Sequence, residues 1–393
     1  MQNRIGIALS GGGSRAMAFH LGCLRTLHKE GLLENSHVIS CVSGGSVIGA
    51  MYASHKGTFD EFEDQVRLTL ARGFVWPAIV TAFTSWEGPK ALSSFIVQYS
   101  IAAISAVTSA ALSIASLLLG LSKDARGRIL PSGSWVRRYA SRTTILRSTI
   151  KRLLFPKLKL DHLIGRRPKL VVIATELRTG SAFYFSSEES GSWRLGKCAS
   201  NEIDVADAVA ASAAYPLLLP ALDEAMAFTK IDGTREVVRV NLTDGGVYDN
   251  LALSPLWPDR DRSVSIAVDD VDTIICCRAG YGPRFDSPSG LLPSRMKQVF
   301  YTVHDRAQNF AMNRLYDLKD AGKIKRFAIA HLGQIDERLE HAPDDLVSRE
   351  ETYGYPTDFS PMTDEWIERL TKRGEQVMLA VLRQHNPDLL TRG

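Results

Sequence analysis

Three glycine-rich segments, each placed directly after an apolar run, constrain this chain more than any other feature. They are residues 10–15 (SGGGSR), 41–46 (CVSGGS) and 244–246 (DGG). The first two are followed by residues with helical spacing, at 14–33 and 46–54, so the chain starts as strand, helix, strand, helix. This alternation predicts a parallel sheet with right-handed crossovers. Because such sheets bind ligands at the carboxyl ends of their strands, we expect the three segments to meet there.

The rest of the chain continues the pattern without an internal repeat or a low-complexity linker. Further strands are expected at 169–176, 182–186, 236–243, 273–277 and 326–330, and helices at 205–215, 293–318 and 362–385. The strands 169–176 and 182–186 are expected to pair around Thr179 and Gly180. We therefore interpret residues 1–393 as one α/β domain with an insertion at about 75–160.

The insertion has an unusual charge pattern. Residues 91–122 include no charged side chain, although serines and threonines give a continuous helix a polar stripe. Residues 123–159 then hold eleven basic residues against one acid, Asp124, so a segment of +10 leaves −6 for the rest of a chain of net charge +4. The apolar part fits an interfacial lid, a single membrane span or an inner core helix. The basic part favours an anionic membrane surface over a merely solvated face.

Composition narrows the class of protein. The chain is 45% hydrophobic and 23% charged, which excludes a disordered chain and a multi-span membrane protein. Its five cysteines show no C-x-x-C spacing and no zinc-type cluster, so we expect a reducing compartment and no metal. No secretory signal is visible at the start, and the overall charge does not suggest a nucleic-acid partner. A cytoplasmic location follows.

The three glycine segments carry the chemistry. Successive glycines at 11–13 let main-chain amides converge on a phosphate or a developing oxyanion. Ser43, between a strand and a helix, has the form of a nucleophile elbow, with Cys41 in place of the usual first glycine. Ser46 is a rival nucleophile that also suits a helix N-cap. A serine nucleophile needs a base, and Asp244 is the candidate.

These motifs together resemble the patatin-like phospholipases, a family of Ser–Asp dyad lipid hydrolases. The resemblance covers about 4–80 and 160–331 and rests on GGGSR at 11–15, VSGGS at 42–46, ASAAYP at 211–216 and DGGVYDN at 244–250. It implies a three-layer α/β/α fold with a mostly parallel central sheet and a helical insertion. It implies cleavage of carboxylic esters of phospholipids or other lipids, as by a phospholipase A or lysophospholipase, without a metal or cofactor. The residue roles implied are nucleophile Ser43, base Asp244, oxyanion hole Gly11, Gly12 and Gly13, and supporting positions Arg15, Gly45, Gly245 and Gly246.

Departures from the family pattern are Cys41 and the long insertion, which bears on substrate access and localisation. With residues 91–159 on an anionic bilayer, the enzyme would be peripheral at the inner membrane face, or would span the membrane once through 91–122.

Three other classes of protein remain open. The first is a Ser–Asp–His esterase or lipase, since His304, His331, His341 and His385 all follow Asp244. The second is a dinucleotide-binding module, because Gly11, Gly13 and Ala16 satisfy G-x-G-x-x-A, although the second strand ends at Ser43 rather than at an acid. The third is a non-catalytic scaffold that binds membranes through the insertion.

Overall fold

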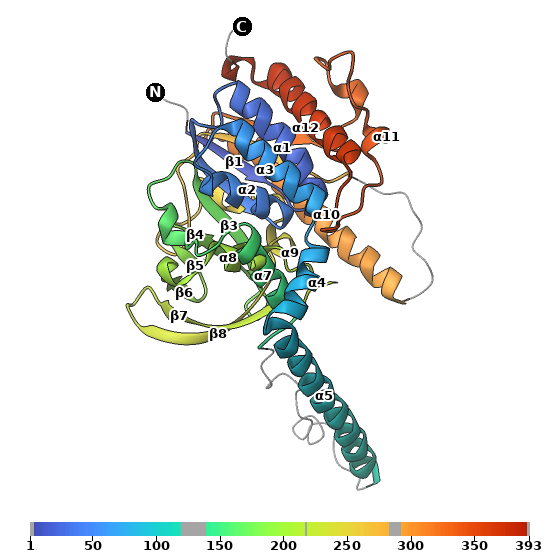
Figure 1. The fold of residues 1–393 in the computed structure, drawn as a ribbon. Helices are drawn as coiled ribbons and strands as arrows, with labels where there is room; N and C mark the ends of the chain where they lie inside the picture. Colours follow the sequence, from blue (N-terminus) through green and yellow to red (C-terminus); the bar gives the residue numbers. More distant parts are fainter. Residues whose placement is uncertain (1–3, 119–138, 217, 283–291, 391–393) are drawn as a thin grey trace.

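A single ten-stranded sheet organises the protein. The computed structural model describes residues 4–118, 139–216, 218–282 and 292–390 (Figure 1). In spatial order the strands are β10 (Arg326–His331), β9 (Thr273–Arg278), β1 (Ile5–Leu9), β2 (Ser36–Val42), β3 (Lys169–Glu176), β4 (Ser181–Ser186), β5 (Ser190–Ser192), β6 (Gly196–Cys198), β7 (Leu222–Thr229) and β8 (Arg235–Asp244).

The sheet has a parallel half and an antiparallel half. Strands β10, β9, β1, β2 and β3 pair in parallel, as the strand–helix alternation predicts. From β3 onward every pairing is antiparallel, and β8 returns to pair with the end of β3, which closes this half on itself. The expected mostly parallel sheet is therefore wrong for β4–β8. The turns after Glu176, Ser186 and Ser192 are too short for a crossover helix, so β3, β4, β5 and β6 must pair antiparallel in turn. The longer connection from β6 to β7, which contains α8, also joins antiparallel strands.

Helices cover both faces of the parallel half, and the strands alternate their side chains between two cores. Ile7 and Leu9 of β1 point into the core under α1 (Gly13–Lys29), α2 (Gly44–Ser54), α3 (Phe59–Arg72), α8 (Val205–Ser212) and α12 (Asp364–His385). Ala8 points into the opposite core, which α10 (Leu292–Asp320) and residues 251–257 cover. Figure 1 shows α1, α3 and α12 side by side over the sheet. This is an α/β fold in three layers.

Short elements complete the chain around these layers. They are α9 (Gly246–Asp249), α11 (Arg349–Thr352) and the 3-10 turns Leu160–Leu163, Ser200–Glu202, Ser254–Leu256, Asp336–Arg338 and Pro387–Leu389.

Two helices of the insertion leave the body of the protein. Helix α4 (Val75–Thr84) leads into α5 (Glu87–Leu118), which projects away from the sheet (Figure 1). Among the described residues, α5 is the one helix long and apolar enough to cross a membrane, and none of its most apolar stretch is buried. The interpretation as an inner core helix is therefore wrong. Residues 119–122 of the apolar segment lie outside the described residues.

Part of the basic segment forms ion pairs with acidic residues of the protein itself. Residues 123–138, with five of its eleven basic residues, lie outside the described part. The rest includes α7 (Arg142–Leu153), which packs against α8, α4 and α5. Arg147 pairs with Glu224 at 2.8 Å and with Asp207 at 3.7 Å, and Lys151 pairs with Asp204. These charges are neutralised within the protein, so α7 offers a membrane less positive charge than its composition indicates.

Candidate active site

Ser43 occupies a strained turn between β2 and α2. Its backbone has φ 53° and ψ −122°, a combination that a non-glycine residue adopts only where its surroundings impose it. The two glycines after it allow the turn to pack main chain against main chain. A methyl group at Gly44 would lie 2.7 Å from the nitrogen of Gly13, and one at Gly45 would lie 2.7 Å from the carbonyl oxygen of Ser10. This is the geometry of a nucleophile elbow.

Cys41 and Ser46, the two ambiguous residues of this motif, both point away from the elbow's tip. The thiol of Cys41 is fully buried and lies 3.3 Å from the carbonyl oxygen of Val171. The hydroxyl of Ser46 donates to the carbonyl of Ser43 at 2.6 Å, within the first turn of α2. Cysteine at position 41 therefore fills core space and leaves the turn unobstructed.

Strand β8 delivers Asp244 to the elbow. Val42 pairs with Ile173 and Asp244 pairs with Ala174, so Ser43 and Asp244 stand at the same level on either side of β3. The Asp244 carboxylate accepts the Gly246 amide at 2.7 Å. Its burial raises the pKa from 3.8 to about 6, and hydrogen bonds from the Ser43 side chain and the Gly246 amide partly oppose that rise. A buried carboxylate of this pKa is a better proton acceptor near neutral pH than an ordinary aspartate.

Ser212, at the end of α8, links the turn at Ser43 to the turn at Asp244. Its hydroxyl accepts the Ser43 amide at 2.9 Å, and its carbonyl accepts the Gly245 amide at 3.2 Å. The Asp244 amide donates to the carbonyl of Ala214 at 3.1 Å. The sequence showed ASAAYP at 211–216 only as a family motif. Its role as a clamp between two turns emerges from the structure.

The three amides of the glycine loop, at Gly11, Gly12 and Gly13, differ in their hydrogen bonding. The amide of Gly11 donates to the carbonyl of Asn250 at 3.0 Å and so ties the loop to the segment after Asp244. The amides of Gly12 and Gly13 have no acceptor in the part of the chain that the structure describes. Gly12 has φ 147° and Gly13 has φ 61°, backbone conformations that favour glycine.

Arg15 and Gly245, two of the residues predicted to support the site, connect it to the surrounding elements. Arg15 is buried, donates to the carbonyls of Ala279 at 3.0 Å and Tyr355 at 3.2 Å, and stacks on Tyr281. It therefore joins α1 to the end of β9 and to the C-terminal segment. Gly245 packs against β2, because a methyl group there would lie 2.7 Å from Cγ2 of Val42.

No histidine joins Ser43 and Asp244 among the residues that the structure describes. The hydrogen-bond partners of the Asp244 carboxylate there are the Ser43 side chain and the Gly246 amide. His304 of α10 forms a hydrogen bond to the backbone of Gly246, two residues after Asp244, and burial lowers its pKa. His331 lies at the end of β10. Within the same described ranges, no group of His, Cys, Asp and Glu side chains could hold a metal ion.

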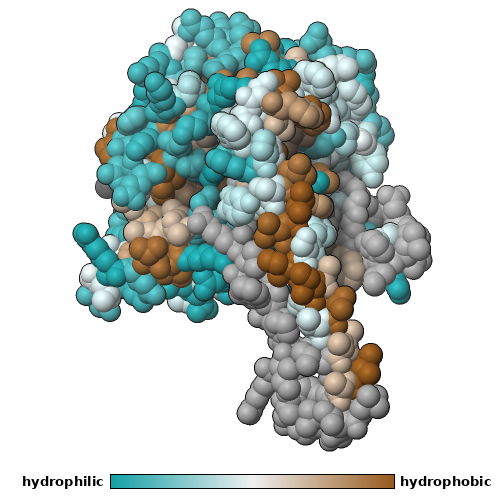
Figure 2. Space-filling view, turned by 60° about the horizontal axis from the view of Figure 1, so that its bottom comes forward, coloured by the Kyte–Doolittle hydropathy of each residue, from teal (hydrophilic) through white to brown (hydrophobic). Residues whose placement is uncertain are grey.

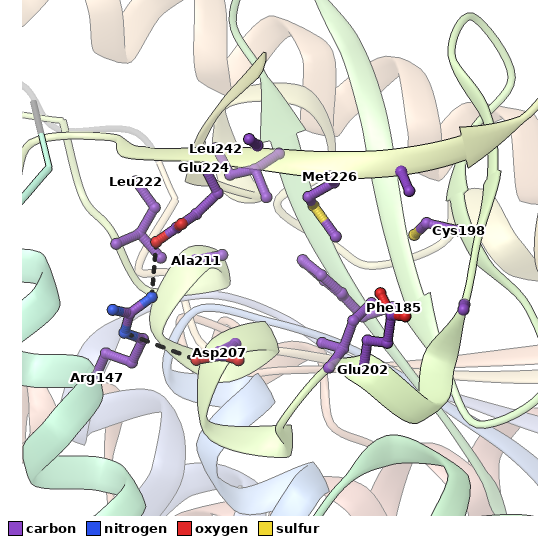
Figure 3. A pocket seen from close by; sticks show the side chains of 14 residues that line it. Arg147, Phe185, Cys198, Glu202, Asp207, Ala211, Leu222, Glu224, Met226 and Leu242 are labelled. Atoms are coloured by element: carbon purple, nitrogen blue, oxygen red, sulfur yellow. Dashed lines mark hydrogen bonds and ion pairs between the residues drawn. The ribbon is translucent and has the colours of Figure 1, made fainter. Parts of the chain in front are cut away.

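A separate cavity of about 210 Å³ lies between α8 and the antiparallel half. Figure 3 shows Arg147 between Asp207 and Glu224 at one end, and Phe185 and Met226 at the other. Neither Ser43 nor Asp244 lines it, so it is distinct from the site that these two residues form. Ala211 of α8 lines the cavity, and the next residue, Ser212, accepts the Ser43 amide.

A serine on a strained strand–helix turn, facing a buried carboxylate at the edge of an α/β sheet, is an arrangement found in serine hydrolases. The chain belongs to the patatin-like phospholipase family, whose model matches residues 7–257.

Solved structures with the same fold include human GIVD cytosolic phospholipase A2 bound to a methyl gamma-linolenyl fluorophosphonate inhibitor and terbium chloride. The TM-score is 0.50 at 14% identity, over 99% of this chain and 60% of the human one. A second structure of human GIVD cytosolic phospholipase A2 gives a TM-score of 0.50 at 13% identity, over 98% of this chain and 61% of the human one. VipD from Legionella pneumophila gives 0.37 at 16% identity, over 98% and 67%. The chain thus spans about three fifths of the human enzyme's length. The search of curated proteins found no match.

Proposed function

We propose that the protein is a lipid acyl hydrolase in which Ser43 is the nucleophile and Asp244 is its base. The observation that carries this proposal is the hydrogen bond between the Ser43 side chain and a buried carboxylate, at the tip of a strained elbow. Ser43 would attack the carbonyl carbon of a carboxylic ester while Asp244 accepts the hydroxyl proton. Departure of the alcohol with that proton leaves an acyl-enzyme, and a water activated by Asp244 then releases the fatty acid.

The amides of Gly12 and Gly13 are the donors we propose for the oxyanion. They belong to the loop that packs against Gly44, next to the nucleophile, and no described residue accepts from them. The Gly11 amide is bound to Asn250, so the proposed hole has two main-chain donors rather than three. In other enzymes one such donor contributes about 3–4 kcal/mol to the transition state.

A fluorophosphonate probe tests the assignment of the nucleophile directly. The human relative was solved with a fluorophosphonate inhibitor. We expect a fluorophosphonate to attach covalently to Ser43, as located by peptide mass spectrometry, and to abolish ester hydrolysis in proportion to labelling. Labelling of Ser46 would overturn the assignment, and an unlabelled but folded protein would favour the non-catalytic scaffold.

The raised pKa of Asp244 predicts the pH dependence of hydrolysis. The base must be ionised, so kcat/KM for a soluble ester should fall about tenfold per pH unit below about pH 6 and level off above it. An aspartate at its ordinary value of 3.8 would place this limb two units lower. His304→Gln should leave the limb in place, because burial lowers the pKa of that histidine. A limb that disappears in His304→Gln would instead favour the Ser–Asp–His hydrolase.

The projecting helices α4 and α5 suit contact with a lipid bilayer, and we include this in the proposal. Figure 2 shows an apolar band running along them. Trp76, Phe83 and Trp86 are 66%, 87% and 79% exposed, which is unusual for aromatic side chains in water. No described element covers these side chains, whereas a bilayer would bury them.

The same helices connect to the active site through the segment 358–361. The carbonyl of Asp358 accepts the amide of Ser14, at the start of α1, and the carbonyl of Phe359 accepts the amide of Phe74, at the start of α4. The rings of Phe74 and Phe359 pack edge to face. Helix α4, which would contact the bilayer, is therefore connected to the glycine loop through residues 358–361.

Removing the exposed aromatic side chains should weaken vesicle binding. We expect Phe83→Ser with Trp86→Ser to lower the partition coefficient on phosphatidylglycerol vesicles at least tenfold, because each aromatic contributes about 1.5–3 kcal/mol when buried. Hydrolysis of a soluble ester should be unchanged. Trp193→Ser is the matched control, since Trp193 is also exposed but lies on the antiparallel half. Equal binding of all three proteins in vesicle sedimentation would contradict membrane contact through α4 and α5.

A further inference from the structure

Arg278 is a buried cation without a carboxylate partner. It is the last residue of β9, at the carboxyl edge of the sheet, and only 7% of its surface is exposed. Its Nε atom is buried without a hydrogen-bond partner, and one terminal nitrogen donates a weak hydrogen bond to the sulfur of Met312 at 3.3 Å. In the described ranges no acidic side chain forms an ion pair with it, and the negative charge of Asp305 on α10 acts on it without direct contact. Burying an unpaired guanidinium is costly, so such a site calls for an anion.

The position of Arg278 relates it to the proposed catalytic residues. Strand β9 lies two strands from β2. Because neighbouring strands lie about 4.8 Å apart, the backbone of Arg278 is about 10 Å from the elbow. This separation is comparable to the length of an extended arginine side chain. Its neighbour Ala279 donates its amide to the hydroxyl of Ser10 at 2.8 Å, and its Cβ lies 3.7 Å from where a methyl group on Gly12 would stand. Arg278 is thus the neighbour in sequence of a residue that contacts the glycine loop.

A second unpartnered nitrogen lies beside it. His331 is the register partner of Arg278 on β10, so the two side chains leave the same face of the sheet, toward α10. Its Nε2 atom is buried and has no hydrogen-bond partner in the described structure. Burial and then the positive charge of Arg278 lower the pKa of His331 to about 3, so its ring is neutral and supplies hydrogen bonding rather than charge.

We infer that Arg278, with His331 beside it, binds the phosphodiester of a phospholipid substrate. This inference rests on the proposed function, because it places the lipid's head group beside the site where Ser43 would attack the ester. The phosphate of a glycerophospholipid is only a few bonds from the acyl ester, so one molecule can reach both places. A guanidinium is well suited to phosphate oxygens, since it presents several donors in one plane. A diacylglycerol has no group that would satisfy Arg278.

The test compares two soluble substrates that differ only in the head group: dihexanoyl phosphatidylcholine below its micelle concentration and dihexanoylglycerol. We expect Arg278→Gln to lower kcat/KM for the phospholipid about tenfold to a hundredfold, mainly through KM, and to leave the diacylglycerol rate unchanged. Arg278→Lys should restore part of the loss, since it returns the charge. Arg326→Gln is the control, because Arg326 lies at the opposite end of β10 and pairs with Asp388.

The outcomes separate this inference from the proposed function. If Arg278→Gln slows both substrates equally, the arginine has a structural role and the subsite is wrong. If it slows neither, the phosphodiester does not bind there. If the wild-type protein hydrolyses the diacylglycerol but not the phospholipid, the hydrolase stands and the subsite fails. If the wild-type protein hydrolyses no ester at all, both proposals fail together.

Discussion

Ser43→Ala is expected to lower kcat for a soluble carboxylic ester by about 10⁴- to 10⁶-fold while the protein remains folded. The loss is large because Ser43 supplies the atom that forms the new bond, and no other hydroxyl stands at the tip of the elbow. Asp244→Asn should cost about 10⁴-fold, because the amide keeps the shape of the carboxylate but cannot accept the serine proton. The two changes together should cost little more than Ser43→Ala alone, since the pair acts as a unit.

Ser46→Ala is the matched control for this experiment. Ser46 lies three residues along the same turn, but its hydroxyl is bound to the carbonyl of Ser43. Its removal should reduce the free energy of unfolding by about 1 kcal/mol and leave most of the activity. Steady-state kinetics and thermal unfolding of the variants provide both readouts. Substantial activity in Ser43→Ala, or a greater loss in Ser46→Ala than in Ser43→Ala, would contradict the proposed nucleophile.

The parts of the fold that the sequence predicts are those fixed by local chemistry. A glycine-rich turn after an apolar run marks the end of a strand, and the segments at Gly11 and Ser43 follow the neighbouring parallel strands β1 and β2, where they meet as predicted. Asp244 also reaches Ser43, but it ends a strand that runs antiparallel to β3, so the rule for parallel strands does not account for its position. Ser43 at positive φ is what a strand–turn–helix with small neighbours predicts. The sequence also indicates the insertion, because residues 91–122 form a long run without charge in a chain of average composition.

The remaining features depend on contacts between distant segments, which leave no periodic signal. Ser212 clamps two turns through one hydroxyl and one carbonyl, yet in the sequence it is one small residue within an alanine-rich helix. The carbonyl of Asn250 accepts the Gly11 amide, which leaves that amide out of the proposed oxyanion hole, and no spacing rule relates residues so far apart. The ion pairs of Arg147 were not predictable for a related reason, since this residue meets its acidic partners only after folding.

Among the single glycine-to-alanine substitutions in the glycine loop, Gly13→Ala should lower kcat the most. Gly13 has φ 61°, and a methyl group there would overlap the carbonyl oxygen of Asp358 and stand 3.1 Å from its carbonyl carbon. That carbonyl accepts the Ser14 amide at 2.8 Å, so main-chain atoms would have to move. The displaced backbone carries a proposed oxyanion donor. We expect kcat to fall about a hundredfold, as for a misplacement of about 1 Å in other enzymes.

Gly31→Ala separates this steric effect from backbone strain. Gly31 lies just beyond the other end of α1 with φ 65°, almost the conformation of Gly13, but a methyl group there would meet no atom within 4 Å. Both substitutions force alanine into the left-handed region, at a cost of about 1–2 kcal/mol. Only Gly13→Ala also displaces the loop, so kcat should fall in that variant and not in Gly31→Ala. If Gly13→Ala and Gly31→Ala lost similar unfolding free energy and had equal kcat values, the displaced loop would not have slowed the reaction. The amides of Gly12 and Gly13 would then not be the oxyanion donors.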